Sequence, residues 1–181
     1  MKNFFLSTLV CSAALATASA QVNVDVFSGH TTTGGGSPYS GLAGSFTSPD
    51  IMFATDTSFA WHPFGLDAFG ADITGHLNVT AAASYAFTLN SDDGSLLFID
   101  GIQVINDGGP HSPGAAGGSI DLTPGCHRFE VQFFEDFGGP SGVDLTLPTG
   151  VTYATPEVAS TGWLLAGAFT MLGALGRRIR K

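Results

Sequence analysis

Basic side chains are almost missing from the middle of this sequence. Residues 21–155 contain no lysine and a single arginine, Arg128, whereas 14 of the 15 acidic residues lie there. Nucleic acids and anionic lipid surfaces are bound through lysine and arginine. The composition therefore argues against both partners and leaves two uses for the acids: a solvated surface, or the binding of divalent cations.

Cysteine is equally scarce, with two in the chain. Cys11 lies in residues 1–20, which have a basic start at Lys2, an apolar stretch over 4–16 and the small residues Ala18-Ser19-Ala20. These are the features of a secretory signal peptide. Cleavage after Ala20 leaves Cys126 alone, so an internal disulfide is excluded and stability must come from the core or from bound metal.

Motifs for catalysis are absent as well. The sequence has no G-x-S-x-G, no G-x-G-x-x-G and no Walker loop. The histidines lack zinc-protease spacing; they are His30, His62, His76, His111 and His127. Glu130, Glu135 and Asp136 could supply the carboxylate pair of a glycosidase, but nothing in their spacing requires it. We expect no enzyme, and an exported hydrolase is the least favoured alternative.

No stretch of 21–155 has a helical apolar period, and short strand-like runs between Gly and Pro turns recur instead. Such runs predict an all-β fold, an antiparallel sandwich or barrel. Residues 28–45 and 108–119 are rich in Gly, Ser, Thr and Pro and are expected to be loops. The expected strands cover 22–27, 51–53, 59–61, 72–79, 85–89, 96–99, 102–105, 119–122, 126–134 and 143–147.

The C-terminal tail, 156–181, consists of Pro156-Glu157, an apolar run over 158–176 and a basic cluster that begins at Arg177. The run is long enough to cross a bilayer as a hydrophobic helix, and the basic end would stay cytoplasmic. This arrangement resembles the PEP-CTERM class of bacterial sorting signals, although Val158 stands at the third motif position. The resemblance implies transient insertion in the inner membrane of a Gram-negative bacterium, cleavage by an exosortase-type protease, and an exopolysaccharide matrix.

Acids are concentrated in the stretch from Leu89 to Gly101. Asp100-Gly101 lies between two apolar runs and predicts a two-residue hairpin turn. Asp92-Asp93-Gly94 predicts a second turn, for which one acid would suffice. Calcium takes hard oxygen ligands from irregular loops, and the oxygen-rich loop 135–141 could face this turn at one end of a sandwich.

Several segments resemble the protective-antigen lectin-like domain, a β-sandwich family found in a bacterial toxin subunit, in glycosidases and in fungal adhesins. The segments are Gly41–Phe46, Gly75 with Leu77, Tyr85–Gly101, Leu122–His127 and Phe133–Glu135. In sugar-binding members the acids that match Asp92 and Asp93 are joined by a cis peptide and hold a calcium ion that coordinates sugar hydroxyls. The same resemblance implies ligands at Asp136 and near Phe137 and Gly138.

The residues Trp61, His62 and His111 could border this site. We therefore expect a signal peptide at 1–20, a lectin-like domain at 21–155 and a sorting tail at 156–181. The expected function is an exported, calcium-dependent carbohydrate-binding module at the cell surface or in the extracellular matrix, with glycans or exopolysaccharide as partners. The alternative is a structural surface or matrix protein of the same fold that binds no sugar.

Overall fold

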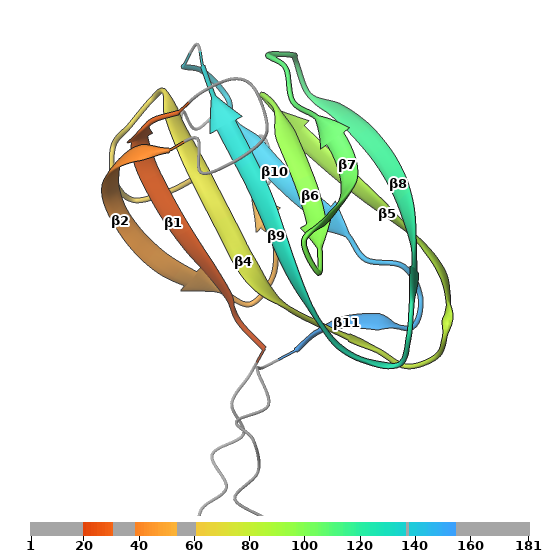
Figure 1. Cartoon of the computed structure of the whole chain (residues 1–181). Coiled ribbons are helices and arrows are strands. Elements are labelled where there is room, and N and C mark those ends of the chain that lie inside the picture. Colours follow the sequence, from red (N-terminus) through yellow and green to blue (C-terminus); the bar gives the residue numbers. More distant parts are fainter. Residues whose placement is uncertain (1–19, 31–38, 54–60, 137, 155–181) are drawn as a thin grey trace, which may run out of the picture.

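The computed structural model describes residues 20–30, 39–53, 61–136 and 138–154. These residues form eleven β-strands and no helix (Figure 1). The strands are β1 Val22–Gly29, β2 Ser40–Ser48, β3 Met52–Phe53, β4 Phe69–Val79, β5 Ala83–Asp92, β6 Ser95–Ile99, β7 Ile102–Asp107, β8 Gly114–Leu122, β9 Gly125–Glu135, β10 Gly142–Thr146 and β11 Val151–Ala154.

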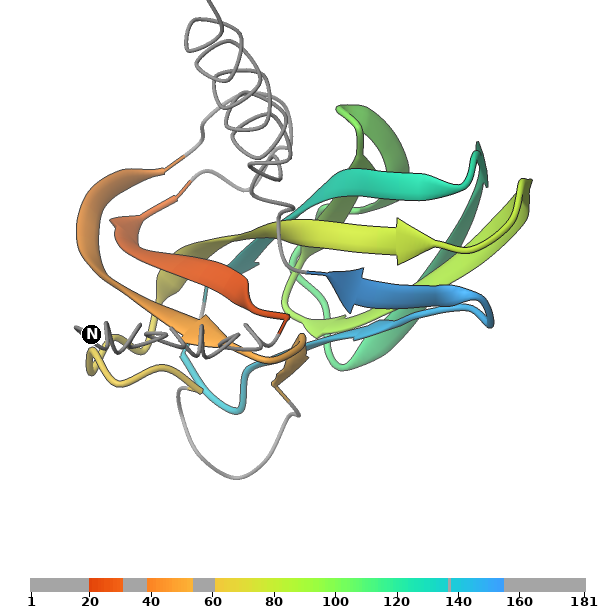
Figure 2. The same ribbon diagram turned by 90° about the horizontal axis from the view of Figure 1, so that it is seen from below.

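The strands build two antiparallel sheets. The larger sheet has the order β2-β1-β4-β9-β6-β7, with β11 paired to β4, and the smaller has the order β3-β10-β5-β8. Figure 2 shows the same strands seen from below. The centre of the larger sheet is the pair β4 and β9, in register from Phe69 opposite Glu135 to Val79 opposite Gly125. The all-β, antiparallel sandwich predicted from the sequence is confirmed for the described residues.

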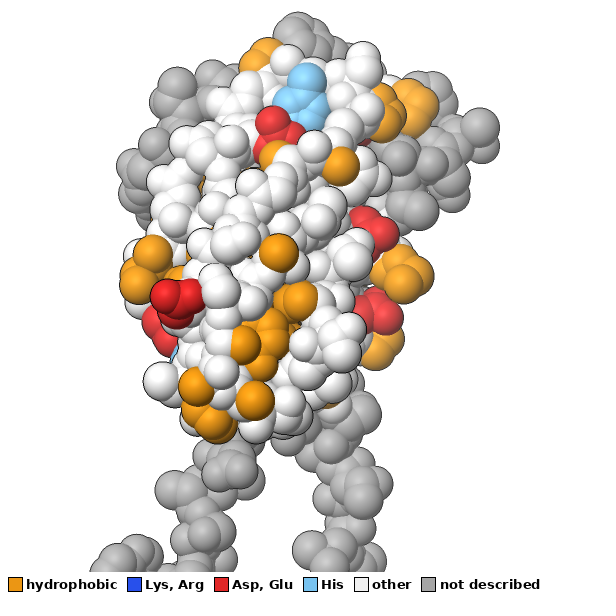
Figure 3. Space-filling model, turned by 90° about the vertical axis from the view of Figure 1, so that its right-hand side faces the viewer, with side chains coloured by type: hydrophobic (Ala, Val, Ile, Leu, Met, Phe, Trp, Pro, Cys, Tyr) orange, Lys and Arg blue, Asp and Glu red, His pale blue; other side chains and the backbone are white. Residues whose placement is uncertain are grey.

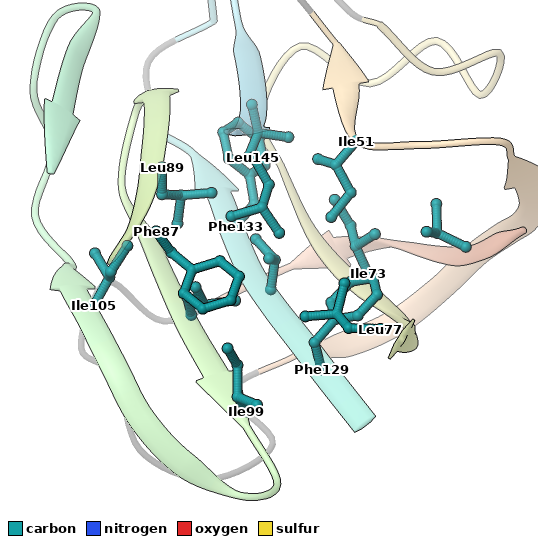
Figure 4. Packing of buried hydrophobic residues seen from close by; sticks show 14 of the residues in the cluster. Ile51, Ile73, Leu77, Phe87, Leu89, Ile99, Ile105, Phe129, Phe133 and Leu145 are labelled. Carbon is teal, nitrogen blue, oxygen red and sulfur yellow. The ribbon is translucent and has the colours of Figure 1, made fainter. Parts of the chain in front are cut away.

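Alternating side chains of β9 show how the core forms. Phe129, Val131 and Phe133 are completely buried, because successive residues of a strand point to opposite faces. Figure 4 shows Phe129 and Phe133 between the sheets, with Phe87 and Leu89 contributed by β5 of the other sheet. Each such side chain contributes about 2 kcal/mol when it is fully removed from water.

Two glycine-rich segments predicted to be loops, 28–45 and 108–119, are strands in part. Residues 40–48 form β2, and 114–119 belong to β8, whereas β11 was not expected from composition. β8 needs small residues because the backbone of β7 lies close to it. A Cβ on Gly118 would lie 2.1 Å from the carbonyl oxygen of Val104. Of the expected strand at 59–61, Trp61 forms a bend and the other two residues lie outside the described ones.

The Asp100-Gly101 hairpin is present, with positive φ angles of 50° and 78°. Asp100 does more than turn the chain, because its carboxylate accepts hydrogen bonds from the backbone N–H of Arg128 (3.0 Å) and contacts His127 Nδ1 at 2.6 Å. The other ring nitrogen of His127 lies 2.8 Å from the carbonyl of Thr123. The hydrogen bond to Asp100, opposed by partial burial and assisted by Thr123, raises the pKa of His127.

The outer face of the larger sheet carries an acidic pair. Asp25 on β1 lies directly opposite Asp72 on β4, and like charges in this position repel. Asp72 Oδ1 is buried without a hydrogen-bond partner. Burial, followed by the charges of Glu130 and Asp25, raises the pKa of Asp72 to about 6. Cys126, on the same face, is an exposed free thiol.

Both ends of the described chain meet at one end of the sandwich. Ala20 and Ala154 line the same hollow of about 560 Å³, together with Asn78 and Cys126. Residues 1–19 and 155–181 lie outside the described residues, so the expected signal peptide (apart from Ala20) and the expected hydrophobic tail do too. Within the described part of the chain, no helix suited to crossing a membrane is found.

Candidate functional site at the Asp92-Asp93 turn

The adjacent acids lie at the end of the sandwich opposite the chain ends. Asp92 is the last residue of β5, and Asp93-Gly94 turns the chain into β6. The peptide bond between Asp92 and Asp93 is cis, the geometry that the family resemblance implies. Because β5 pairs with β10 up to Gly142 opposite Asp92, the turn lies beside the loop that joins β9 to β10.

The Asp93 carboxylate connects two loops to this turn. Its Oδ1 accepts a hydrogen bond from the backbone N–H of His111 (2.8 Å), and its Oδ2 accepts one from the backbone N–H of Asp136 (3.0 Å). Asp93 is 5% exposed. A buried carboxylate with charge-assisted bonds to two backbone donors is held firmly, so the loops around His111 and Asp136 are fixed relative to Asp92.

Gly94 is required by the packing beneath the turn. A Cβ at this position would lie 2.3 Å from Cε1 of Phe134 and 2.9 Å from the carbonyl oxygen of Gly109. The backbone N–H of Phe134 donates to the Gly94 carbonyl at 3.0 Å. The aromatic ring therefore forms a floor on which only a residue without a side chain can turn.

Among the residues that the structure describes, Asp92 forms no ion pair with a lysine or arginine. Partial burial and then the charge of Asp93 raise the pKa of Asp92, while His111 acts in the opposite direction. Burial lowers the pKa of His111, but its contacts with Ser112, Asp107 and Asp93 outweigh burial and raise the pKa overall. His111 Nε2 lies 3.3 Å from Asp107 Oδ2. His111 thus borders the site, as expected from the sequence.

The structure places three other predicted site residues, Asp136, Gly138 and Trp61, in different surroundings. The side chain of Asp136 contacts His30, whose Nε2 lies 3.4 Å from Asp136 Oδ1. Gly138 has a φ of 65° that suits glycine, and Phe137 lies outside the described residues. Trp61 packs in an aromatic cluster, where its ring stacks on Phe53 at a centroid distance of 4.4 Å and meets Phe133 at 5.6 Å.

His62 also belongs to this aromatic cluster rather than to the site. Its ring meets Phe69 edge on at 4.2 Å, and burial lowers its pKa. Three further residues near the acids were not singled out from the sequence: His30, Asp107 and Ser141. Their signal is weak, because single His, Asp and Ser residues carry no spacing in the sequence that distinguishes them.

The donor chemistry fits a calcium ion in part. Two adjacent carboxylates and loop backbone oxygens are hard ligands of the kind calcium takes, and Ser141 Oγ is a buried hydroxyl without a hydrogen-bond partner beside Gly142. Among the described residues no three His, Cys, Asp or Glu side chains are grouped so that they could hold a metal. The side-chain ligands would therefore be Asp92 and Asp93, and the remaining oxygens would come from backbone, hydroxyl groups or a bound molecule.

The surface around the site is poor in basic groups. Figure 3 shows the side of the molecule that carries β8, with acidic and histidine side chains near one end and no lysine or arginine among its described residues. Arg128 is on the larger sheet, where its Nη2 lies 3.7 Å from Glu130 Oε2. The described residues on this side of the molecule therefore present no lysine or arginine charge.

Comparison with known proteins places these features in a family. Residues 22–155 match the family model of the PA14 domain. The structure is similar to the PA14 sugar-binding domain from an RTX adhesin, with a TM-score of 0.55 and 16% identity over 72% of this chain and 91% of that one. It is also similar to the A domain of epithelial adhesin 9 from Candida glabrata in complex with Galβ1-4GlcNAc, with a TM-score of 0.51 and 13% identity over 79% and 90%.

A further similar structure is an anti-sigma factor domain-containing protein, with a TM-score of 0.58 and 15% identity. The match covers 75% of this chain but 44% of that protein, so this chain spans less than half of its length. At such identities the likenesses show the fold, and no curated protein matches the sequence. The family model, however, covers residues 22–155, which are most of the chain. This protein therefore belongs to the PA14 domain family, the family of protective-antigen lectin-like domains that the sequence around Asp92 and Asp93 resembles.

Proposed function

We propose that this protein is an exported carbohydrate-binding module that holds a calcium ion at Asp92 and Asp93. Its role is adhesion at the cell surface or attachment within an extracellular matrix. The observation that carries the proposal is the Asp93 carboxylate, which uses both oxygens to fix two loops while the adjacent Asp92 carboxylate stays partly exposed. Two matched sugar-binding adhesin domains support the carbohydrate part.

The chemistry of the turn suits this role. Calcium supplies coordination sites for neutral, paired oxygen donors such as the vicinal hydroxyls of a sugar. Asp92 and Asp93 would provide the negative charge, and Asp93 also keeps the loops of His111 and Asp136 in place. Because the site has acids and no lysine or arginine in its described surroundings, an acidic sugar would have less favourable electrostatics than a neutral one.

Calorimetric titration of the full chain with calcium tests the metal site. Asp92→Asn keeps the shape and leaves both hydrogen bonds of Asp93 intact, and we expect it to weaken calcium binding by roughly tenfold or more through loss of ligand charge. Asp121→Asn is the matched control, because Asp121 is exposed near the far end of β8, opposite Ser84 of β5. It removes one charge and should leave the affinity unchanged.

A glycan array with and without a calcium chelator tests the sugar. The proposal requires binding that disappears with the chelator and in Asp92→Asn but persists in Asp121→Asn. If the wild-type chain gives no binding heat when calcium is added, or if the chelator does not affect sugar binding, the calcium-dependent mechanism is contradicted. Turnover of a bound sugar by the purified chain would instead identify an enzyme.

A second candidate is a structural surface or matrix protein with the same fold. It is favoured by the lack of three grouped metal-binding side chains among the residues that the structure describes. In that case Asp93 would serve only to join the loops. The array separates the two candidates, because a structural protein shows no glycan signal in either condition while Asp93→Ala still lowers its stability.

Export and sorting are proposed from the sequence of the two flanks. The signal peptide at 1–20 would direct export, and 158–176 would hold the protein in the inner membrane until an exosortase-type protease cuts the tail. Mass spectrometry of the protein recovered from the cell surface gives the mature ends. Recovery of an intact tail, or of an intact residue 1–20 segment, would contradict this processing.

A further inference from the structure

His30, directly after β1, is placed by packing before any polar contact is considered. Its ring stacks on Phe134, with a centroid distance of 5.3 Å and an interplanar angle of 19°. A Cβ on Gly70 would lie 3.0 Å from His30 Cβ and 2.4 Å from Tyr39 Cδ1, so both side chains cover this glycine. The ring is therefore held against the same phenylalanine that supports the Asp92-Asp93 turn.

Tyr39 strengthens this arrangement. Its hydroxyl lies 3.0 Å from the carbonyl oxygen of Ala71 and 3.1 Å from that of Phe133, as a shared donor. Burial raises the pKa of Tyr39, so the phenol keeps its proton and remains a donor. Tyr39 thereby ties its ring to β4 and β9, close to the point where His30 meets β9.

The polar edge of His30 is directed to one partner. Nε2 lies 3.4 Å from Asp136 Oδ1, and the His30 side chain is 9% exposed. Its Nδ1 is buried and has no hydrogen-bond partner among the residues that the structure describes. Within the described residues, Asp136 is thus the polar group that the ring contacts.

Asp136 itself has two separate connections. Its side chain contacts His30, whereas its backbone N–H donates to Asp93 Oδ2 at 3.0 Å. A continuous series of contacts therefore runs from the end of β1 through Asp136 to the turn of adjacent acids. Loss of the His30 contact would free the Asp136 side chain and allow its N–H to move away from Asp93.

We propose that His30 is a positioning residue that, through the Asp136 side chain, fixes the Asp136 N–H on Asp93 and thereby orders the calcium site. The part that concerns calcium rests on the proposed function. The contact between His30 and Asp136 also assigns Asp136 a role different from the one expected from the sequence: its carboxylate anchors the loop rather than ligating the ion.

Amide hydrogen exchange in the absence of calcium tests the positioning role directly. His30→Phe keeps an aromatic ring on Phe134 and removes the nitrogen that contacts Asp136. We expect the amide of Asp136 to exchange roughly tenfold faster in this variant, because its bond to Asp93 opens more often. The amide of Phe134, bonded to Gly94, is the internal control and should be unchanged. His30→Gln, which restores a side-chain N–H donor, should return the Asp136 amide toward its wild-type rate.

Calcium titration of the same variants separates positioning from direct ligation. Outer-shell partners of metal ligands typically change affinity by about 10–100-fold. We expect His30→Phe and Asp136→Ala each to weaken calcium binding by about tenfold, the double variant to be no weaker than either, and Asp136→Asn to bind like the wild type. Coupled residues are non-additive in this way.

Unchanged exchange at Asp136 in His30→Phe would overturn the positioning role. A much larger calcium loss in Asp136→Ala than in His30→Phe, or additive losses in the double variant, would overturn it as well by making Asp136 a direct ligand. If the wild-type chain binds no calcium, the proposed function fails, and the exchange measurement still decides the role of His30.

Discussion

Replacing Gly118 by alanine tests how the two sheets close along the β7 and β8 side. The added Cβ would lie 2.1 Å from the Val104 carbonyl oxygen, 2.9 Å from its carbonyl carbon and 3.0 Å from Cγ1 of Ile105. Backbone atoms, unlike the tip of a flexible side chain, cannot rotate away. Reaching an ordinary contact distance therefore requires β7 and β8 to separate by about 1 Å, a gap that forfeits roughly a quarter to a half of the dispersion energy of each contact it widens.

The size of the effect follows from two opposing contributions. Overpacking of this kind costs about 1–3 kcal/mol, and a backbone clash belongs at the upper end. Alanine recovers about 0.5–1 kcal/mol relative to glycine in a strand, because glycine loses more freedom on folding. We expect Gly118→Ala to lower the free energy of unfolding by about 2 kcal/mol, and the melting temperature by roughly 8 °C for a domain of this size.

Gly117→Ala is the matched control on the adjacent residue. Its nearest neighbour would be the Phe87 carbonyl oxygen at 3.7 Å, an ordinary contact, so this variant should be unchanged or about 0.5–1 kcal/mol more stable. Urea and thermal unfolding of both variants, followed by circular dichroism, measure the difference. Equal stability of the two variants would refute the argument that position 118 must be glycine because β7 approaches it closely.

Three other variants test the charges of Asp72 and His127 and the packing of Gly94 on the Phe134 ring. Asp72→Asn should raise the free energy of unfolding at neutral pH by about 1 kcal/mol. Because the pKa of Asp72 is raised in the folded state, the wild type loses stability as pH rises from about 4 through about 6, and an amide avoids this loss. Equal pH profiles of the two proteins in urea unfolding from pH 3 to pH 8 would contradict this expectation. His127→Phe should remove a stabilisation that is fully present below the ordinary histidine pKa and is lost as pH rises through the raised one, so its deficit relative to the wild type should be larger at pH 5 than at pH 9. A deficit independent of pH would mean that the contact with Asp100 does not depend on the histidine charge. Gly94→Ala should displace Phe134 and destabilise the chain by about 2 kcal/mol, and a thermal melt like that of the wild type would show that the ring can move at no cost.

The strand core could be predicted because its signals are local. Phe129, Val131 and Phe133 alternate along one strand, and the Asp100-Gly101 turn is fixed by two neighbouring residues. Segments such as β8 could not be recognised in this way. Its glycines mark a loop by composition, and only the approach of Val104 from a different strand explains why small residues are needed there.

The candidate site was predictable to a similar extent. Asp92 and Asp93 stand out as an excess of charge at a turn, and the segment Tyr85–Gly101 carries the family resemblance. The partners of Asp93 do not stand out, because its bonds go to the backbone N–H groups of His111 and Asp136, and any residue except proline has such a group. His30 lies 106 positions before Asp136 in the sequence, and no local pattern links a single histidine to a distant acid.

The nearness of Ala20 and Ala154, the outermost described residues, bears on how the domain would meet the ligand proposed above. Ala20 and Ala154 line one hollow at the Val79 end of β4, and the Asp92-Asp93 turn lies at the other end, about 30 Å away for a strand of this length. Under the proposed function, attachment through either flank would leave the turn at the end of the sandwich away from the attachment point. Copies fixed to one surface would present their turns in the same direction, so that several weak contacts with one repetitive polymer add to a strong avidity without any change in the individual site.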